Sequence, residues 1–221
     1  MSFVIAIDGP AGSGKGTVAE LVSKKLGFIN IDTGATFRCV TLAMLENKIG
    51  LDENNKIKKL LKEIEIEFKE NDSDKKIFLN GIDVTRKIRE KEVSEFVSPV
   101  ATLQIVRENL LYLQRKMAEG KNVVMEGRDI GTTVFPNADV KIYLTASAEE
   151  RARRRLKQLQ EKGIDCTYED ALKNVKLRDQ IDSTRELAPL IQAEDAVLID
   201  SSKKTIQEVV DEVLNLVEQK K

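Results

Sequence analysis

A glycine-rich stretch near the N-terminus constrains this chain more than any other feature. Residues 9–17 read Gly-Pro-Ala-Gly-Ser-Gly-Lys-Gly-Thr, after the apolar run Phe3–Asp8 and before a helix-compatible segment that ends at Leu26. A strand, a glycine-rich loop and a helix in this order are typical of a phosphate-binding loop, and the alternative is a plain turn. The glycines let successive N–H groups converge, and the helix adds its positive N-terminal end. We therefore expect a triphosphate to bind Gly9, Pro10, Ala11, Gly12, Ser13, Gly14, Lys15, Gly16 and Thr17.

Within this loop, Lys15 is expected to bridge the β- and γ-phosphates. The general pattern places Ser or Thr directly after the lysine to hold Mg²⁺, but here Gly16 occupies that position and the hydroxyl follows at Thr17. Nucleoside monophosphate kinases commonly carry this Gly-Lys-Gly-Thr form. We expect Thr17 to contact Mg²⁺ through water rather than directly.

Composition excludes several classes of function. The chain has 221 residues, of which 41% are hydrophobic, enough for one large α/β domain with an insertion. It has no Trp, only 5% aromatic residues and a net charge of −1, so neither nucleic acid nor membrane is an expected partner. Histidine is absent, which excludes Ser-His-Asp and Cys-His catalysis and histidine-based metal sites. Lys, Arg, Asp and a bound cation must carry the chemistry.

The cysteines and the N-terminus indicate the compartment. Cys39 and Cys166 are far apart, with neither metal-site spacing nor a disulfide framework, so we expect reduced thiols. The N-terminal apolar run is too short for a signal peptide or a membrane span. A cytoplasmic protein is expected, and a monomer, since no exposed apolar stripe stands out.

Apolar runs alternate with amphipathic stretches along the chain, which predicts a parallel sheet with crossover helices. The predicted strands are Phe3–Asp8, Phe28–Ile31, Asn122–Met125, Val140–Leu144 and Ala196–Ile199. The predicted helices are Gly16–Leu26, Ala35–Asn47, Val106–Ala118, Ala148–Gln160, Tyr168–Gln180 and Ile206–Glu218, the last capped by Thr205.

The segment Ile57–Val100 breaks this alternation. Ile64–Phe68 alternates like a half-buried strand, and Lys75–Val84 reads as a hairpin that turns at Asn80 and Gly81. A small antiparallel sheet inside a parallel α/β chain predicts an insertion subdomain.

Arginines follow two of the predicted strands, in Asp32–Arg38 and in Glu126–Thr132. Ligands of open α/β sheets bind beyond the carboxyl ends of the strands, where a guanidinium can grip phosphate oxygens in pairs. Arg38 and Arg128 are therefore expected at a second phosphate site. A solvated or salt-bridged arginine is the alternative at each position.

Together these motifs closely resemble the bacterial cytidylate kinase family, nearly from end to end. The resemblance rests on residues 7–17, 32–35, 126–132, 135–136, 178–179 and 188–190, and the run from Gly127 to Pro136 is close to diagnostic. It implies an α/β, three-layer P-loop NTPase fold with a parallel five-stranded sheet, a small antiparallel insertion subdomain and a helical lid. The implied single domain, 1–221, has its core at 1–56, 101–147 and 186–221, the insertion at about 57–100 and the lid at about 148–185.

The resemblance also implies residue roles. Arg38, Arg128 and Arg185 would hold the acceptor phosphate, and Arg178 and Asp182 would contact the sugar. Ser98, Arg107 and Asp129 would read the cytosine ring, since an acidic acceptor suits its amino group and leaves uracil unpaired. Family members commonly have Ser and Tyr where this chain has Thr33 and Phe37. Thr33 keeps the hydroxyl and stays in the expected acceptor site, whereas Phe37 lacks the phenol.

Several of these residues have a second interpretation. Ser98 precedes Pro99 and could cap or break a helix. Arg107 could pair with a glutamate on its own helix, and Asp182 could cap a turn. Asp32 and Glu126 could orient arginines or water around Mg²⁺, or simply end their strands.

Four arginines lie within residues 151–155. A charged, exposed helix is the plain interpretation. In the family this segment begins the lid over ATP, and Arg151 and Arg155, four residues apart on one face, are favoured over Arg153. Gly163 could serve as a hinge.

The expected reaction is direct in-line transfer of the γ-phosphoryl group from ATP to CMP or dCMP with Mg²⁺, and Lys15, Arg128, Arg151 and Arg155 as catalytic residues. The nearest alternative is a kinase for UMP or AMP. A GTP-dependent switch would need an Asn-Lys-x-Asp motif, which the sequence lacks. A phosphate-loop binding module without catalysis is the remaining alternative.

Overall fold

The computed structural model describes residues 2–71, 74–161 and 163–220. The chain divides into two compact units, one made of Met1–Ile31 with Ala118–Lys221 and the other of Asp32–Met117. Each unit has its own hydrophobic core and is described by itself. None of the helices in the described part of the chain is both long and apolar enough to cross a membrane.

The first unit is built on a five-stranded sheet with the strand order β2-β6-β1-β7-β8. Central β1 runs parallel to β6 on one side and to β7 on the other, and all five of its residues are buried. The carboxyl ends of these strands therefore meet at one edge of the sheet. The strands are β1 (Val4–Asp8), β2 (Ile29–Asp32), β6 (Val123–Gly127), β7 (Val140–Thr145) and β8 (Val197–Asp200).

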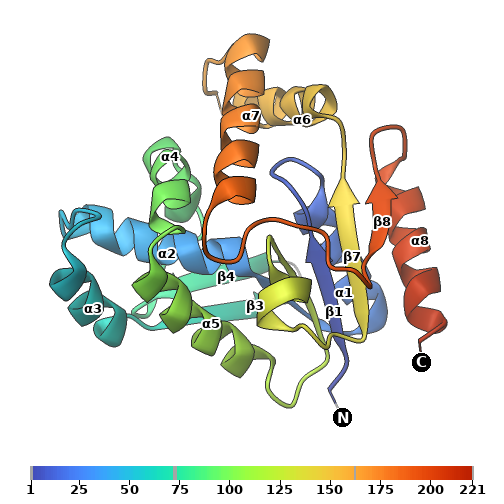
Figure 1. Cartoon of the computed structure of the whole chain (residues 1–221), viewed down its shortest axis with the longest axis horizontal. Helices are drawn as coiled ribbons and strands as arrows, with labels where there is room; N and C mark the ends of the chain where they lie inside the picture. The colour runs from blue at the N-terminus through green and yellow to red at the C-terminus, as the bar shows by residue number, and fades with distance from the viewer. Residues whose placement is uncertain (1, 72–73, 162, 221) are drawn as a thin grey trace. The chain divides into compact units, whose positions relative to one another are not determined.

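Helices α1 (Lys15–Leu26) and α8 (Ile206–Glu218) pack beside each other in this unit (Figure 1). Their apolar residues form one buried cluster with the strands of the sheet, from Ile5 and Ile7 to Val209 and Val213. α8 begins at the predicted cap, since the Thr205 hydroxyl accepts the amide hydrogen of Glu208. The period of 3.6 residues thus buries one face of each helix.

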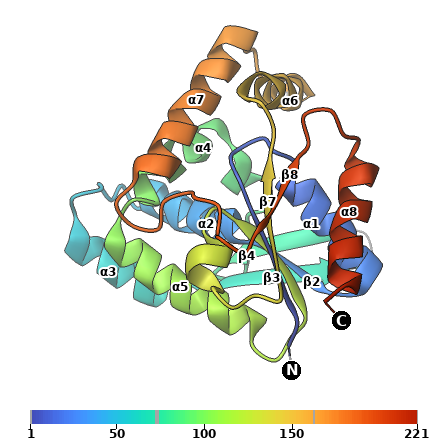
Figure 2. The same ribbon diagram turned by 45° about the vertical axis from the view of Figure 1, so that its right-hand side comes forward.

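Two further helices follow β7. α6 (Ala148–Glu161) and α7 (Tyr168–Thr184) lie side by side, as Figures 1 and 2 both show. Between β6 and β7 the chain forms the short π-helical turn η2 (Ile130–Val134). α7 begins with a capping box between Thr167 and Asp170 and extends four residues beyond its predicted end.

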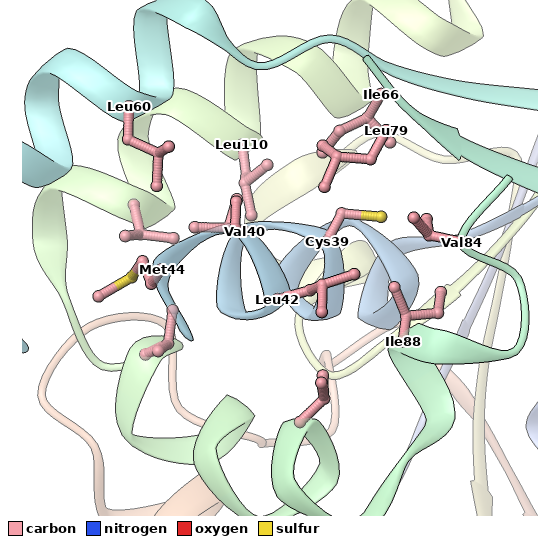
Figure 3. Packing of buried hydrophobic residues seen from close by; sticks show 14 of the residues in the cluster. Cys39, Val40, Leu42, Met44, Leu60, Ile66, Leu79, Val84, Ile88 and Leu110 are labelled. Carbon is pink, nitrogen blue, oxygen red and sulfur yellow. The ribbon is translucent and has the colours of Figure 1, made fainter. Parts of the chain in front are cut away.

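The second unit contains a separate three-stranded antiparallel sheet, in the order β3-β4-β5. Asn80 and Gly81 join β4 to β5 with φ angles of 50° and 76°, the left-handed pair that a type I′ hairpin requires. A buried apolar cluster around α2 forms the core, with Val40, Met44 and Leu110 among its members (Figure 3). The elements are α2 (Thr33–Glu46), α3 (Asn54–Glu63), β3 (Ile66–Asn71), β4 (Asp74–Leu79), β5 (Ile82–Asp83), η1 (Lys87–Arg89), α4 (Lys91–Val100) and α5 (Gln104–Ala118).

The predicted fold class is confirmed: a parallel five-stranded sheet flanked by helices, with a separate small antiparallel sheet. The five predicted strands and six predicted helices are all present, with ends shifted by a few residues at most. Neither α3 nor α4 was predicted. The strand expected from Ile64 begins at Ile66, because the Ile64 amide still bonds back to Leu60 of α3. The expected insertion, 57–100, falls inside the second unit, and its boundaries stay a prediction.

Candidate active site

The loop between β1 and α1 has the backbone that an anion receptor needs. Gly9 has a φ of 149°, and a Cβ atom there would lie 2.0 Å from the Leu144 carbonyl oxygen, so only glycine fits. Gly14 caps α1 in the left-handed conformation with a φ of 94° and offers no side chain to the first N–H groups of the helix. Those N–H groups remain available to an incoming anion.

Lys15 is held against its own loop. Its Nζ atom donates to the Pro10 carbonyl oxygen at 2.9 Å and to the Ser13 hydroxyl at 3.5 Å, and the residue is only 5% exposed. Burial, followed by the nearby Arg128 cation, lowers the pKa of Lys15 to about 7. A phosphate group in the loop would replace the carbonyl partner and favour the charged form of the ammonium group.

The glycine after the lysine lets a carboxylate approach the loop. A Cβ atom on Gly16 would lie 2.9 Å from Oε1 of Glu126, the residue near the end of β6. Thr17 is exposed on the first turn of α1. The hydroxyl and carboxylate oxygens here are the donors that Mg²⁺ prefers, usually together with water and substrate phosphates. No cluster of three or more metal-binding side chains occurs in residues 2–71, 74–161 and 163–220, so an all-protein cage is absent there.

Four charged residues from two segments form a largely buried cluster in the same unit. Nε of Arg128 donates to Asp182 at 2.8 Å, and Arg185 lies 3.5 Å from Asp129 and 3.8 Å from Asp182. Burial alone would raise the pKa of Asp182, but Arg128, Arg185 and Arg178 together lower it. The structure therefore brings together five of the predicted acceptor-site residues, the fifth being Arg178 beside this cluster.

The other predicted acceptor residues, Thr33, Arg38, Ser98 and Arg107, lie in the second unit. Asp32 accepts the Ala35 amide hydrogen as the N-cap of α2, and its other oxygen accepts Nη2 of Arg38 at 2.6 Å. Asp32 thus both ends its strand and orients an arginine, as one interpretation of the sequence proposed. Thr33, the first residue of α2, is buried, and its carbonyl accepts the Thr36 hydroxyl.

Arg107 joins two helices of the second unit. Its Nη1 atom donates to the Ala101 carbonyl at the end of α4, and its guanidinium carbon lies 5.4 Å from the centre of the Phe37 ring. Phe37 lacks the phenol hydroxyl, and its ring makes a cation–π contact with Arg107. Ser98 is 8% exposed and lies inside α4, which continues through Pro99 to Val100, so Ser98 does not begin a helix.

Three arginines of α6 have different surroundings. Arg151 is 5% exposed and uses four N–H groups: two on the Asp179 carboxylate at 2.7 and 2.8 Å, one on Ala146 O and one on Ala11 O. Arg155 is partly buried, and its Nε has no hydrogen-bond partner among the described residues. Arg153, which the sequence disfavoured, is exposed beside Glu150.

Arg154 was missed by the sequence reasoning. Its guanidinium donates to the Ser13 carbonyl of the loop at 3.2 Å and to Ser201 at the end of β8. Ser201 itself donates to the same Ser13 carbonyl at 3.1 Å. Bonds to backbone carbonyls leave no residue pattern, although the spacing of Arg154 from Arg151 by three residues puts both on one helix face.

The chain was compared with known proteins. The family model described as cytidylate kinase matches residues 5–219. A cytidylate kinase from Fusobacterium nucleatum subsp. nucleatum is 50% identical over 220 residues, which is 100% of this chain and 99% of that protein. One from Carboxydothermus hydrogenoformans is 51% identical over 216 residues, 98% of this chain and 97% of that protein. The crystal structure of an uncharacterized protein from Eubacterium ventriosum shares the fold, with a TM-score of 0.55 and 14% identity over 98% of this chain and 99% of that one.

Proposed function

Because the chain belongs to the cytidylate kinase family, it is a nucleoside monophosphate kinase, and we propose that it transfers the γ-phosphoryl group of ATP to the phosphate of CMP or dCMP. One observation supports the proposal. The first unit contains both a glycine-rich loop with a buried lysine and a largely buried cluster of two arginines and two carboxylates, which suit a phosphoryl donor and a phosphate acceptor respectively. The loop suits a chain of phosphates, and the cluster suits a phosphate joined to a polar sugar.

The donor is held by Gly9–Thr17. Backbone N–H groups and the N-terminus of α1 surround the β- and γ-phosphates, and Lys15 exchanges its bond to Pro10 for a phosphate oxygen. Thr17, through water, and Glu126 are the residues that would hold Mg²⁺. When bound, Mg²⁺ neutralises charge on the β- and γ-phosphates.

The acceptor phosphate is held by Arg128, Arg185 and Arg38. Planar guanidinium groups bind phosphate oxygens in pairs, and partial burial strengthens those bonds. Asp182, whose lowered pKa keeps it ionised, accepts a hydroxyl hydrogen of the sugar beside Arg178. The carboxylate thus has two tasks, since it also orients Arg128.

The base is recognised by Asp129, Ser98 and Arg107, with Thr33 completing the acceptor site. Cytosine carries an amino donor where uracil carries a carbonyl. A carboxylate such as Asp129 accepts from that amino group but faces the oxygen of uracil with no hydrogen to share, which penalises UMP. Phe37 orients Arg107 through the ring contact.

The transfer needs no general base. An oxygen of the acceptor phosphate forms the new bond to the γ-phosphorus while the bond to the bridging oxygen of ADP breaks, so no proton has to be removed. The absence of histidine is therefore no handicap. Lys15, Arg128 and the loop N–H groups neutralise the spreading charge, and Arg155, whose Nε lacks a partner among the described residues, joins them as the lid closes. Arg151 contributes through Ala11 of the loop and has one N–H group left for phosphate. Closure of the lid excludes water and so prevents hydrolysis of the γ-phosphate, which is the competing reaction.

A coupled assay for ADP across CMP, dCMP, UMP, AMP and GMP tests the proposal. Steady ADP formation with CMP or dCMP, and little with the other acceptors or with none, is the expected result. A preference for UMP would overturn the role of Asp129. ADP formation that is the same with and without acceptor would overturn the kinase assignment.

Replacing Lys15 with Met tests the donor site. We expect kcat to fall by roughly 100-fold or more, because a donor aimed at the transferring group is lost, while the dissociation constant for CMP changes little. Calorimetric titration with CMP supplies the binding arm. Equal turnover in the variant and the wild type would exclude Lys15 from the reaction.

The proposed enzyme acts as a monomer on small substrates in the cytoplasm. Its two cysteines are both free, which supports a reducing compartment. Size-exclusion chromatography with light scattering, at working concentration and with both nucleotides present, tests the monomer.

A further inference from the structure

One buried carboxylate at the centre of the first unit has no role in the proposed chemistry. Asp8 is the last residue of β1 and directly precedes the phosphate loop at Gly9. It is 5% exposed, and its register partner on β6 is Gly127. A buried carboxylate is costly unless its oxygens accept hydrogen bonds.

Both oxygens of Asp8 accept from the segment that follows β6. Oδ1 accepts the amide hydrogen of Ile130 at 2.8 Å, and Oδ2 accepts that of Gly131 at 2.7 Å. These amides open the π-helical turn η2, where the first N–H groups have no acceptor within the turn itself. Asp8 therefore supplies the acceptors from a neighbouring strand.

The turn is held from its other end as well. The Phe135 amide bonds to the Ile130 carbonyl at 2.7 Å, and Nζ of Lys141 donates to the Pro136 carbonyl and to Asp195. A Cβ atom on Gly131 would lie 3.2 Å from Cδ of Lys141, so the Lys141 side chain lies close to the backbone there. The segment between Gly127 and this fixed turn consists of Arg128 and Asp129 alone.

We propose that Asp8 is a positioning residue for the acceptor site, which by binding the amides of Ile130 and Gly131 fixes where Arg128 and Asp129 stand beside the phosphate loop. The inference rests on the proposed acceptor role of Arg128 and Asp129. Asp8 ends the strand that leads into the phosphate loop and also binds the segment that carries Arg128 and Asp129. One carboxylate thus fixes the position of the acceptor residues relative to the phosphate loop. Asp8 itself touches neither substrate.

The chemistry of the two bonds selects the test variant. The N–H groups of Ile130 and Gly131 each bond to a different oxygen of Asp8, so both carboxylate oxygens must act as acceptors. An amide at this position has one accepting oxygen and one donating nitrogen, so Asp8→Asn makes one N–H group face another donor. The shape is kept and one bond is lost. Loss of one buried bond of this kind corresponds to about a tenfold change in an equilibrium constant.

Asp200→Asn is the matched control. Asp200 is the last residue of β8 and likewise accepts from the turn that follows it, at the Ser202 amide (2.8 Å) and the Ser202 hydroxyl (2.6 Å), but it is exposed and outside the proposed site. It repeats the chemistry of a strand-end carboxylate without the link to the acceptor loop.

The experiment measures KM for CMP, KM for ATP and kcat in the wild type and both variants. We expect Asp8→Asn to raise KM for CMP about tenfold while KM for ATP changes by less than about threefold. Asp200→Asn should leave both KM values unchanged. A loss of folded protein alone would lower the apparent kcat and leave both KM values as they are, and that result would overturn the proposal.

Amide hydrogen exchange in the wild type provides a measurement that does not depend on the variant folding. The Ile130 and Gly131 amides should exchange as slowly as the amides of β1, and CMP should slow them further. Exchange at the rate of open loop amides would overturn the proposal. If the wild type prefers another monophosphate, the proposed function fails, and the same KM comparison made with that acceptor still tests Asp8.

Discussion

The ion pair between Arg151 and Asp179 makes a sharp prediction about what holds the phosphate loop in place. Arg151 is one of four arginines on α6, yet its side chain is only 7% exposed and its guanidinium binds the loop at Ala11, the end of β7 at Ala146 and α7 at Asp179. Replacing it with Lys keeps the positive charge and the helix propensity and removes the fork of donors. The variant therefore tests the geometry of the pair rather than its charge.

The size of the effect follows from the bonds that are lost. A lysine ammonium can replace one or two of the four bonds, so two or three disappear, each with a net value of about 1 kcal/mol. Asp179 is 30% exposed, so water solvates part of the stranded carboxylate and keeps the cost below that of a fully buried broken pair. We expect Arg151→Lys to lower the free energy of unfolding by about 2–3 kcal/mol.

Arg153→Lys is the matched control. It makes the same chemical change two residues away, on a side chain that is 67% exposed and 3.5 Å from Glu150. An exposed pair of this kind contributes less than about 0.5 kcal/mol. Urea unfolding followed by circular dichroism at pH 7 compares the two variants, and a double-mutant cycle with Asp179→Asn isolates the pair. Equal midpoints for Arg151→Lys and Arg153→Lys, or a coupling energy near zero, would refute the reasoning.

Two predictions concern buried titratable groups. Burial raises the pKa of Asp8 from 3.8 to about 6, with Asp129 adding to the shift and the Ile130 and Gly131 amides and Lys15 opposing it. Between pH 6 and 4 the folded protein therefore binds a proton at Asp8 that the unfolded chain does not bind. Urea unfolding at pH 7 and at pH 5 should show that the wild type gains about 1 kcal/mol of stability relative to Asp8→Asn at the lower pH. A loss of stability over that range would contradict the assignment. Burial also raises the pKa of Cys39 to about 12, so about one thiol in ten thousand is ionised at pH 8. A thiol reagent should label one cysteine in the native protein and two after unfolding, and Cys166→Ser should remove the fast reaction, whereas rapid labelling of Cys39 would contradict its burial.

Much of the fold was predictable because the first unit follows local rules. β1 is an unbroken apolar run whose five residues are all buried, and α8 combines a cap at Thr205 with an apolar residue on every turn. The hairpin at Asn80 and Gly81 was predictable because few residue pairs adopt its left-handed angles. In each case one segment carries its own signal, and distant residues only confirm it.

The second unit shows where such signals weaken. Ile57, Leu60 and Leu61 have helical spacing and are buried in α3, so this helix could have been predicted. In α4 the sequence is misleading, because the pair Ser98-Pro99 predicts a helix break, whereas the helix continues to Val100. A proline in the last turn removes one N–H group, and packing of Val93 and Val100 in the core offsets that loss.

The candidate site divides in the same way, between residues with a chemical motif and residues that hold them. Lys15 and Arg128 could be singled out from the sequence because one belongs to a glycine-rich loop motif at the start of α1 and the other directly follows a strand, where phosphate-binding cations are expected. Asp8, Arg154 and Ser201 were not, because their partners are backbone groups brought near by the sheet, and a backbone amide or carbonyl has no residue identity. A carboxylate at the end of any strand would have looked the same in the sequence. What distinguishes Asp8 is that β1 lies between β6 and β7, so its end meets the loop that leaves β6. If Asp8 fixes Arg128 and Asp129 as we propose, their positions depend on a residue that only the topology identifies, which is why the test of Asp8 must separate the acceptor KM from the donor KM.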